Sequence, residues 1–135
     1  MLTILLVESD PAVSRVMGRL LQAEGFAVIP ASGAREALTL LRRERSTVAL
    51  VAAEWEPPDM GGDAFLEGVE RVAPGTPLLR LSPGMALIGH ADRRADPAVA
   101  SKPFRADDLP RHVRAALGLP PREGMERRHA ARVSA

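Results

Sequence analysis

The sequence predicts an α/β fold in which helices cover both faces of a doubly wound parallel sheet. Short apolar runs of strand length alternate with longer runs that repeat at helical spacing. The strand-like runs are apolar throughout, which is typical of parallel strands that are buried on both faces. The chain has 135 residues, which suits one domain. Strands that alternate with helices imply right-handed crossovers between parallel strands.

The first half of the chain predicts two strand–helix units. Residues 2–7 and residues 26–29 are short apolar runs with β-branched members. Between them, Asp10-Pro11 predicts a helix start with an N-cap and a first-turn proline, and Gly25 predicts the end of that helix. A second helix is expected at 34–45, where three arginines in the last turn suit the helix dipole. These are Arg42, Arg43 and Arg45.

The second half follows the same alternation but is less regular after residue 82. Residues 83–96 allow at most a short or irregular fourth helix, because glycines and a polar run interrupt them. Five strand–helix units fit the order 2-1-3-4-5 of a flavodoxin-like sheet. The elements expected here are strands at 47–53, 77–81 and 98–100, a helix opened by Gly61-Gly62, and a last helix at 106–117.

Composition excludes several functional classes. The chain carries 18 basic and 17 acidic residues, a net charge of +1, which does not favour general binding to nucleic acid or membranes. It has no cysteine, so it can form neither disulfides nor thiolate metal sites. No apolar run approaches the ~20 residues that a membrane span needs. The first residues lack the pattern of a signal peptide, so we expect a cytoplasmic protein.

We expect a folded domain at 1–117 and a basic, flexible tail at 118–135. The tail contains four arginines, two glutamates and two adjacent prolines, and it has no aromatic residue. It is too short for a helix-turn-helix domain. We therefore expect no direct contact with nucleic acid, and any effect on transcription would act through a partner.

Polar residues follow four of the predicted strands at the same edge of the sheet. Glu8-Ser9-Asp10 follows the first strand, Glu54 closes the third, and Ser82 and Lys102 follow the fourth and fifth. Carboxylates can hold Mg²⁺ or accept a phosphoryl group, and a hydroxyl and an ammonium can bind its oxygens. The edge is therefore suited in principle to phosphoryl chemistry.

These motifs resemble the receiver domain of bacterial response regulators, the CheY-like domains of two-component systems. The resemblance rests on Ile4-Leu5-Leu6-Val7-Glu8-Ser9-Asp10-Pro11, on Glu54 with Pro58 and Met60-Gly61-Gly62 after it, and on Ser101-Lys102-Pro103-Phe104. It covers residues 2–117. It implies a domain that accepts a phosphoryl group from a histidine kinase on an aspartate, with Mg²⁺ bound, and then changes a surface that partners contact.

The resemblance also implies roles for single residues. Glu54 occupies the phosphoacceptor position, and Glu8 and Ser9 occupy the acidic pair that would hold the metal. Ser82 occupies the hydroxyl switch position, and Lys102 is the lysine that would contact the phosphate. Val99 stands where the family has an aromatic switch residue. The residues that could ligate a metal are Glu8, Glu54 and, more weakly, Glu56.

Three departures from the family pattern point to an atypical member. The acceptor is glutamate instead of aspartate, Ser9 replaces the second acid, and Val99 replaces the switch aromatic. A longer acceptor moves its oxygens, and a displacement of about 1 Å can cost roughly 10²-fold in rate. Glu54 could instead form a permanent ion pair with Lys102, which would act either as a constitutive mimic of the phosphorylated state or only as a structural salt bridge.

Three functional hypotheses follow. The leading one is a stand-alone pseudo-receiver that signals by protein contact without aspartyl phosphorylation, with no cofactor and no enzymatic activity. The alternative is a conventional receiver in a histidine-kinase phosphorelay, which requires Mg²⁺. The third is a nucleotide-binding or enzymatic domain on the same fold, which the acids of the first loop disfavour because they would repel phosphates.

The partner surface that the resemblance implies is the face formed by the fourth helix, the fifth strand and the fifth helix. Several arginines fall on it, which favours an acidic protein partner; the alternative is that these side chains are only solvated. A histidine kinase is a second possible partner, and we expect a monomer or a weak homodimer. The arginines are Arg93, Arg94, Arg105, Arg111 and Arg114.

Overall fold

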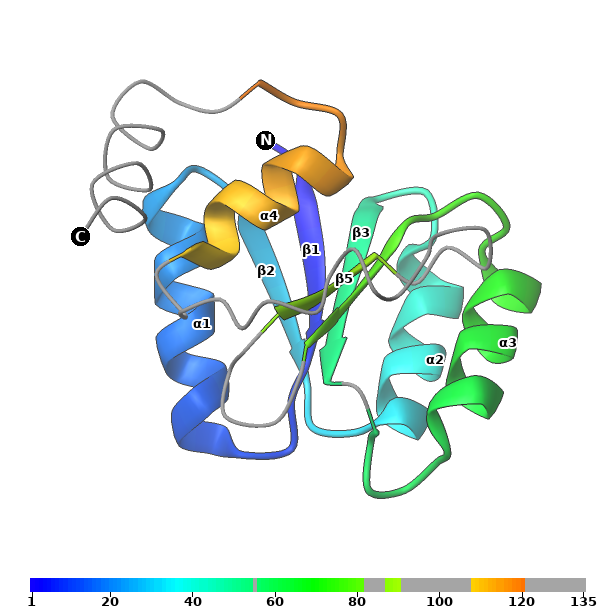
Figure 1. Ribbon diagram of the computed structural model, residues 1–135. Coiled ribbons are helices and arrows are strands. Elements are labelled where there is room, and N and C mark those ends of the chain that lie inside the picture. Colours follow the sequence, from blue (N-terminus) through cyan, green and yellow to red (C-terminus); the bar gives the residue numbers. More distant parts are fainter. Residues whose placement is uncertain (55, 82–86, 91–107, 121–135) are drawn as a thin grey trace.

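A five-stranded sheet forms the centre of the computed structural model, which describes residues 1–54, 56–81, 87–90 and 108–120 (Figure 1). The strand order is β2-β1-β3-β4-β5, which confirms the predicted order for the first four strands, whereas the fifth strand of the sheet is formed by residues 87–90 and not by the predicted 98–100. Strands β1 to β4 run parallel to one another, as expected, whereas β5 is antiparallel to β4, so the prediction of an entirely parallel sheet is wrong for this strand. The strands are β1 (Thr3–Val7), β2 (Ala27–Ala31), β3 (Val48–Glu54), β4 (Leu78–Leu81) and β5 (Leu87–His90).

Helices lie on both faces of the sheet (Figure 1). Helices α1 and α4 cover one face, and α2 and α3 cover the other. The helices are α1 (Pro11–Ala23), α2 (Ala34–Glu44), α3 (Gly62–Val72) and α4 (Leu109–Ala116).

Strand β1 is buried on both sides and divides the core into two clusters. Leu5 and Val7 pack in the cluster under α2 and α3, whereas Ile4 and Leu6 pack in the cluster under α1 and α4. All four side chains are fully buried. This explains why the strand reads as a continuous apolar run instead of an alternating one.

The predicted boundaries of α1 are confirmed. The Asp10 carboxylate accepts hydrogen bonds from the backbone N–H groups of Ala12 at 2.9 Å and Val13 at 3.4 Å. Pro11 is the first helical residue. Gly25 has a φ of 92°, a left-handed conformation that glycine adopts without strain and that ends the helix. The last helix also ends at a left-handed glycine, Gly118.

The expectation for residues 83–96 is wrong at 87–90, which form strand β5 instead of part of a helix. Strand β5 runs antiparallel to β4, with Leu79 paired to His90 and Arg80 to Gly89. The reason is the length of the connection: β4 ends at Leu81 and β5 begins at Leu87. A parallel crossover needs a dozen or more residues. A link this short therefore permits β5 to pair with β4 only in the antiparallel direction.

Three expectations concern residues outside the described part of the chain. The strand expected at 98–100, the rest of the fourth helix, and the tail beyond residue 120 belong to this group. The boundary between a domain at 1–117 and a tail at 118–135 therefore stays a prediction. Within the described residues, none of the helices has both the length and the apolar character that crossing a membrane requires.

Candidate functional site

The candidate site lies where the carboxyl ends of β1 and β3 meet. Val7 pairs with Ala53 in the parallel register, so Glu8 and Glu54, the next residue of each chain segment, emerge at the same edge. The Ser9 hydroxyl donates a hydrogen bond to Oε2 of Glu54 at 3.1 Å. The structure thus brings together Glu8, Ser9 and Glu54, three of the residues that the sequence nominates.

Only one of the two carboxylate oxygens of Glu54 has a hydrogen-bond partner. Its Oε2 accepts the Ser9 hydrogen bond, but its Oε1 is buried and has no hydrogen-bond partner. Burial raises the pKa of Glu54 above its ordinary value, because it disfavours the charged form, and the Ser9 hydrogen bond opposes that rise. A half-buried carboxylate with one unpaired oxygen costs stability unless another group compensates it.

Glu8 experiences the same environment. Its pKa is raised, first by burial and then by the nearby Glu54 carboxylate, while the backbone N–H of Asp10, which donates to Glu8 Oε1 at 3.3 Å, lowers it. None of the largest causes of either pKa shift is a positive side chain. Glu54 therefore disfavours the charged form of Glu8, whereas a side-chain hydrogen bond with Glu8 lowers the pKa of Glu54. Lys102, the expected counter-charge, lies outside the described residues.

Two further acids in the β3–α3 segment have different partners. Glu56 Oε2 accepts a hydrogen bond from the backbone N–H of Gly62, the first residue of α3, at 3.1 Å. Asp59 accepts from the first N–H groups of α2, those of Ala34 at 2.9 Å and Arg35 at 3.0 Å. These backbone N–H groups lower the pKa of Asp59. Glu56 and Asp59 therefore serve the starts of helices.

The sequence analysis missed the role of Asp59, although a signal for it exists. Helices α2 and α3 both have glycine N-caps, Gly33 and Gly61, which have no side chain to accept a hydrogen bond. Their first N–H groups must therefore find acceptors elsewhere. A Cβ at Gly33 would lie 3.0–3.1 Å from the Asp59 carboxylate, so a glycine there also makes room for it.

Within the described residues, the side chains that could ligate Mg²⁺ at this edge are Glu8 and Glu54. Mg²⁺ prefers six oxygens in near-ideal octahedral geometry. Glu8 and Glu54 converge and one Glu54 oxygen is unpaired, but the second acid position holds the neutral Ser9, and Glu56 is engaged by α3. No group of three or more acidic or histidine side chains in the described part of the chain could hold a metal.

The remaining nominated residues divide into two groups. Ser82, Val99 and Lys102 lie outside the described residues, as do Arg93, Arg94 and Arg105. Arg111 and Arg114 lie on α4 and are half-buried. Arg114 donates from Nε to the Pro120 carbonyl at 2.7 Å, which ties it to the chain that follows α4.

No protein-family model matches the chain. Two curated proteins are similar to it: transcriptional regulatory protein GlrR of Escherichia coli (strain K12) and transcriptional regulatory protein QseF of Escherichia coli O157:H7. Each is 33% identical over 79 residues, which is 58% of this chain. The chain spans only 17% of the length of these relatives in the match.

Solved structures of receiver domains share the fold. A response regulator receiver domain from Clostridium thermocellum matches 87% of this chain and 95% of its own, with a TM-score of 0.69 at 21% identity. A CheY-like receiver domain from Methanospirillum hungatei JF-1 matches 95% and 98%, with a TM-score of 0.66 at 24% identity. A chain from the complex of histidine kinase ThkA with response regulator protein TrrA matches 87% and 99%, with a TM-score of 0.64 at 24% identity.

The chain therefore has the fold of response-regulator receiver domains, as its motifs predict.

Proposed function

We propose that this chain is a receiver-like signalling domain that acts through contact with a protein partner, without conventional phosphorylation of Glu54. The observation that carries the proposal is the hydrogen bond from Ser9 to Glu54. A neutral hydroxyl occupies the position of the second metal-binding acid and engages the oxygen of the residue that would accept the phosphoryl group. Both the metal and the acceptor functions are weakened by the same contact.

The length of Glu54 supports the same proposal. Glutamate is one methylene longer than aspartate, which shifts the carboxylate relative to a site built for in-line attack. A displacement of about 1 Å can reduce such a rate by roughly 10²-fold. The substitution and the loss of the second acid act in the same direction.

The permanent charge of the Glu54 carboxylate could replace the charge that a transferred phosphoryl group brings to this edge of the sheet. Glu54 supplies up to one negative charge, compared with about −1.5 to −2 for a phosphoryl group. Paired with Lys102, it would hold the edge in a constitutive state that resembles the phosphorylated one. If the pair is merely structural, the partner surface would not depend on it.

A conventional phosphoryl-accepting receiver is the second candidate, and one observation favours it. Glu54 Oε1 has no hydrogen-bond partner, so no hydrogen bond of the described residues would have to break for it to attack a phosphodonor or to bind a metal. In that case a histidine kinase would be the expected donor, as the complex of ThkA with TrrA illustrates for another protein. Under either candidate the chain is a signalling domain in the cytoplasm, and we do not propose an enzyme.

The partner surface is proposed to be the face that contains α4. Arg111 and Arg114 lie on this helix, and Arg93, Arg94 and Arg105 come before it in the sequence. A surface rich in arginine favours a partner that presents carboxylates.

The first experiment tests phosphorylation directly. The full chain is incubated with Mg²⁺ and a small-molecule phosphodonor, and its intact mass is measured, while a parallel titration with Mg²⁺ and beryllofluoride follows the fluorescence of Trp55, the only tryptophan. We expect no added phosphoryl mass and no saturable change at low millimolar Mg²⁺. A phosphorylated mass that disappears in Glu54→Gln would overturn the proposal in favour of the conventional receiver.

The second experiment asks which departure matters more. Glu54→Asp restores the length of the acceptor, and Ser9→Asp restores the second acid. We expect the double variant to respond to Mg²⁺ and beryllofluoride, and Glu54→Asp alone to respond weakly, because the metal still lacks a ligand. A double variant that stays silent would show that residues other than these two prevent phosphorylation.

A further inference from the structure

We propose that the groove between α1 and the edge strand β2 binds an acidic segment of a partner protein, through Arg15 and Arg19 and an apolar side chain seated over Gly18. This surface differs from both the edge at Glu54 and the face that contains α4. The proposal stands whether or not Glu54 is phosphorylated.

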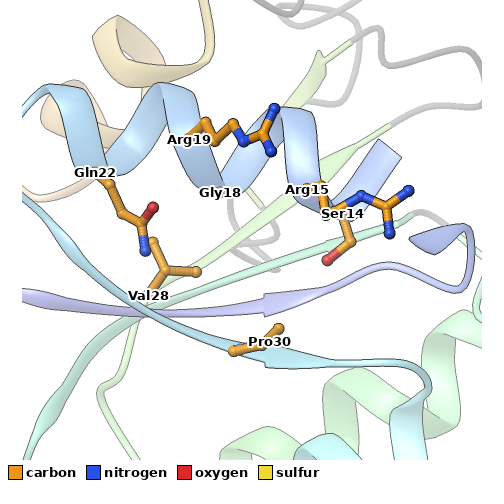
Figure 2. A pocket seen from close by; sticks show the side chains of 7 residues that line it. All are labelled: Ser14, Arg15, Gly18, Arg19, Gln22, Val28 and Pro30. Atoms are coloured by element: carbon orange, nitrogen blue, oxygen red, sulfur yellow. The ribbon is translucent and has the colours of Figure 1, made fainter. Parts of the chain in front are cut away.

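The groove has room for side chains, not for a folded element. Its volume is about 280 Å³, enough for one or two side chains of a partner. Ser14 and Arg15 line one end, and Gln22 and Val28 line the other, with Pro30 on the floor side (Figure 2). Gly18 and Arg19 complete the lining from α1.

The charge of α1 is entirely positive. Between Pro11 and Ala23 the helix has two arginines and no acidic residue. Arg15 and Arg19 are one helical turn apart, so they lie on the same side of α1, and both are exposed. No hydrogen bond or ion pair within the described part of the chain engages either one. Two guanidinium groups therefore stand at the rim of the groove, ready to pair with carboxylates.

Gly18 keeps the middle of the groove open. Glycine is unfavourable inside a helix, since it loses more conformational freedom on folding than other residues. Packing does not require it: a Cβ at this position would meet only Val28 Cγ1, at 4.0 Å, which is an ordinary contact. Gly18 is also buried, and the missing side chain leaves apolar surface at Val28 and Pro30 reachable from outside.

The opposite wall favours recognition of side chains over addition of a strand. Strand β2 is at the edge of the sheet, where an added strand could pair with its backbone. Pro30 has no N–H to offer to such a strand and is itself exposed. An occupant would therefore be held by its apolar and acidic side chains.

Other occupants fit less well. The chain's own segment 118–135 is basic by sequence, so its charge opposes Arg15 and Arg19. A second copy offers an acidic stripe on α3, formed by Asp63, Glu67 and Glu70. However, the exposed large apolar residues in the described part of the chain are Met1, Leu2 and Val16, and none is on α3. Exposed ion pairs alone contribute too little to overcome the cost of association.

The test uses two synthetic peptides of equal length, one of glutamate and leucine at helical spacing and one in which lysine replaces glutamate. Each is titrated into the ¹⁵N-labelled full chain. We expect the acidic peptide to shift amide signals at residues 14–22 and 27–30, with an affinity that weakens as salt rises toward about 0.15 M. The lysine peptide should leave these signals unchanged.

Matched variants separate the groove from net charge. Arg15→Glu with Arg19→Glu should weaken binding by about tenfold or more, because attraction is replaced by repulsion at both sites. Arg42→Glu with Arg43→Glu makes the same change of charge on α2 and should bind normally. Equal weakening in both pairs, or amide shifts elsewhere on the chain, would overturn the proposal.

A second pair of variants tests whether the open space at Gly18, in the middle of the groove, is needed for binding. Gly18→Gln should fill the groove and reduce binding several-fold, whereas Gly18→Ala should bind like the original chain, because its added Cβ meets only Val28. The dispersion of the amide spectrum reports whether each variant is folded. Sedimentation of the unlabelled chain completes the test, because it measures self-association as a function of concentration. If the chain self-associates and Arg15→Glu with Arg19→Glu abolishes this, the groove binds a second copy of the chain, and the proposal of a partner segment is overturned.

Discussion

Two pairs of acids lie near the same edge of the sheet, and they behave in opposite ways. Asp59 and Glu56 each accept hydrogen bonds from helix N-termini. Glu8 and Glu54 face each other instead, with raised pKa values and one buried oxygen unpaired. The first pair stabilises the fold through backbone N–H groups, whereas burial of the second pair disfavours the charged form of both carboxylates.

This difference separates structural acids from candidate functional ones. An acid that holds a helix start has a sufficient explanation in the fold. An acid that keeps an unpaired oxygen in a partly buried place does not, and perturbed groups of that kind concentrate at functional sites. Of the metal-binding candidates, Glu56 therefore belongs with Asp59, and Glu8 and Glu54 remain.

The largest expected effect is the loss of the Asp59 contact. Asp59→Ala leaves the first two N–H groups of α2 without their acceptor, and we expect unfolding free energy to fall by about 1–2 kcal/mol, as for other helix caps. Urea denaturation followed by circular dichroism measures this. Asp59→Asn keeps an acceptor and should lose less. Equal losses in the two variants would mean that charge, and not the hydrogen bonds, supports α2.

The next prediction tests whether Gly33 and Asp59 act as a unit. Gly33→Ala places a Cβ 3.0–3.1 Å from the Asp59 carboxylate and should destabilise the original chain by about 0.5 kcal/mol. Gly33 is in extended backbone, which alanine also adopts. In the Asp59→Ala background the clash is gone, so the same substitution should stabilise by about 0.5 kcal/mol, because it restricts the unfolded chain. The same sign in both backgrounds would contradict the coupling.

Removing the charge of Glu54 should have a smaller effect of opposite sign. Glu54→Gln eliminates a half-buried carboxylate, and we expect a gain of roughly 0.5 kcal/mol at neutral pH, reduced by solvent screening. Thermal unfolding of the two proteins measures it. Ser9→Ala should destabilise the original chain and have little effect on the Glu54→Gln variant. A loss of stability in Glu54→Gln would mean that a counter-charge already compensates Glu54.

The smallest effect is a difference in pH dependence. The folded-state pKa of Glu54 is above its unfolded value of about 4.5, so the stabilising contribution of its protonated form is complete below pH 4.5 and is lost as pH rises through the folded pKa. The original chain should therefore gain stability relative to Glu54→Gln as pH falls from 7 toward 4.5. Denaturation of both proteins at several pH values tests this.

Asp59 should show the opposite trend. Its folded-state pKa is lowered below 3.8, so its contribution is present above that pH and is lost as pH falls through the folded pKa. The difference in stability between the original chain and Asp59→Asn should therefore shrink below pH 3.8. A difference in stability that stays constant would mean that the charge of Asp59 does not contribute to the stabilising contact.

Much of the fold could be predicted because local signals agreed with the global arrangement. The apolar runs of β1 and β3, the N-cap at Asp10 and the end at Gly25 each specify their element alone. The convergence of Glu8, Ser9 and Glu54 followed from the parallel order of the strands. These predictions required only periodicity, turn chemistry and topology.

The features that were missed depend on distances between separate segments. The antiparallel strand at 87–90 depends on the short link from Leu81, which the short apolar run itself does not reveal. Asp59 reaches α2 across the fold, and no pattern near residue 59 indicates its partner. The unpaired Glu54 oxygen arises from burial by surrounding atoms, which periodicity cannot report.

The contacts of Glu56 and Asp59 have a consequence for how a change at Glu54 would spread. A few residues after Glu54, the same segment holds the first amides of both helices on one face of the sheet. A shift of this segment would release those amides before it disturbed the core. Amide hydrogen exchange at Ala34, Arg35 and Gly62 should therefore respond first to events at Glu54, which gives the domain a readout on the α2–α3 face that does not depend on the face that contains α4.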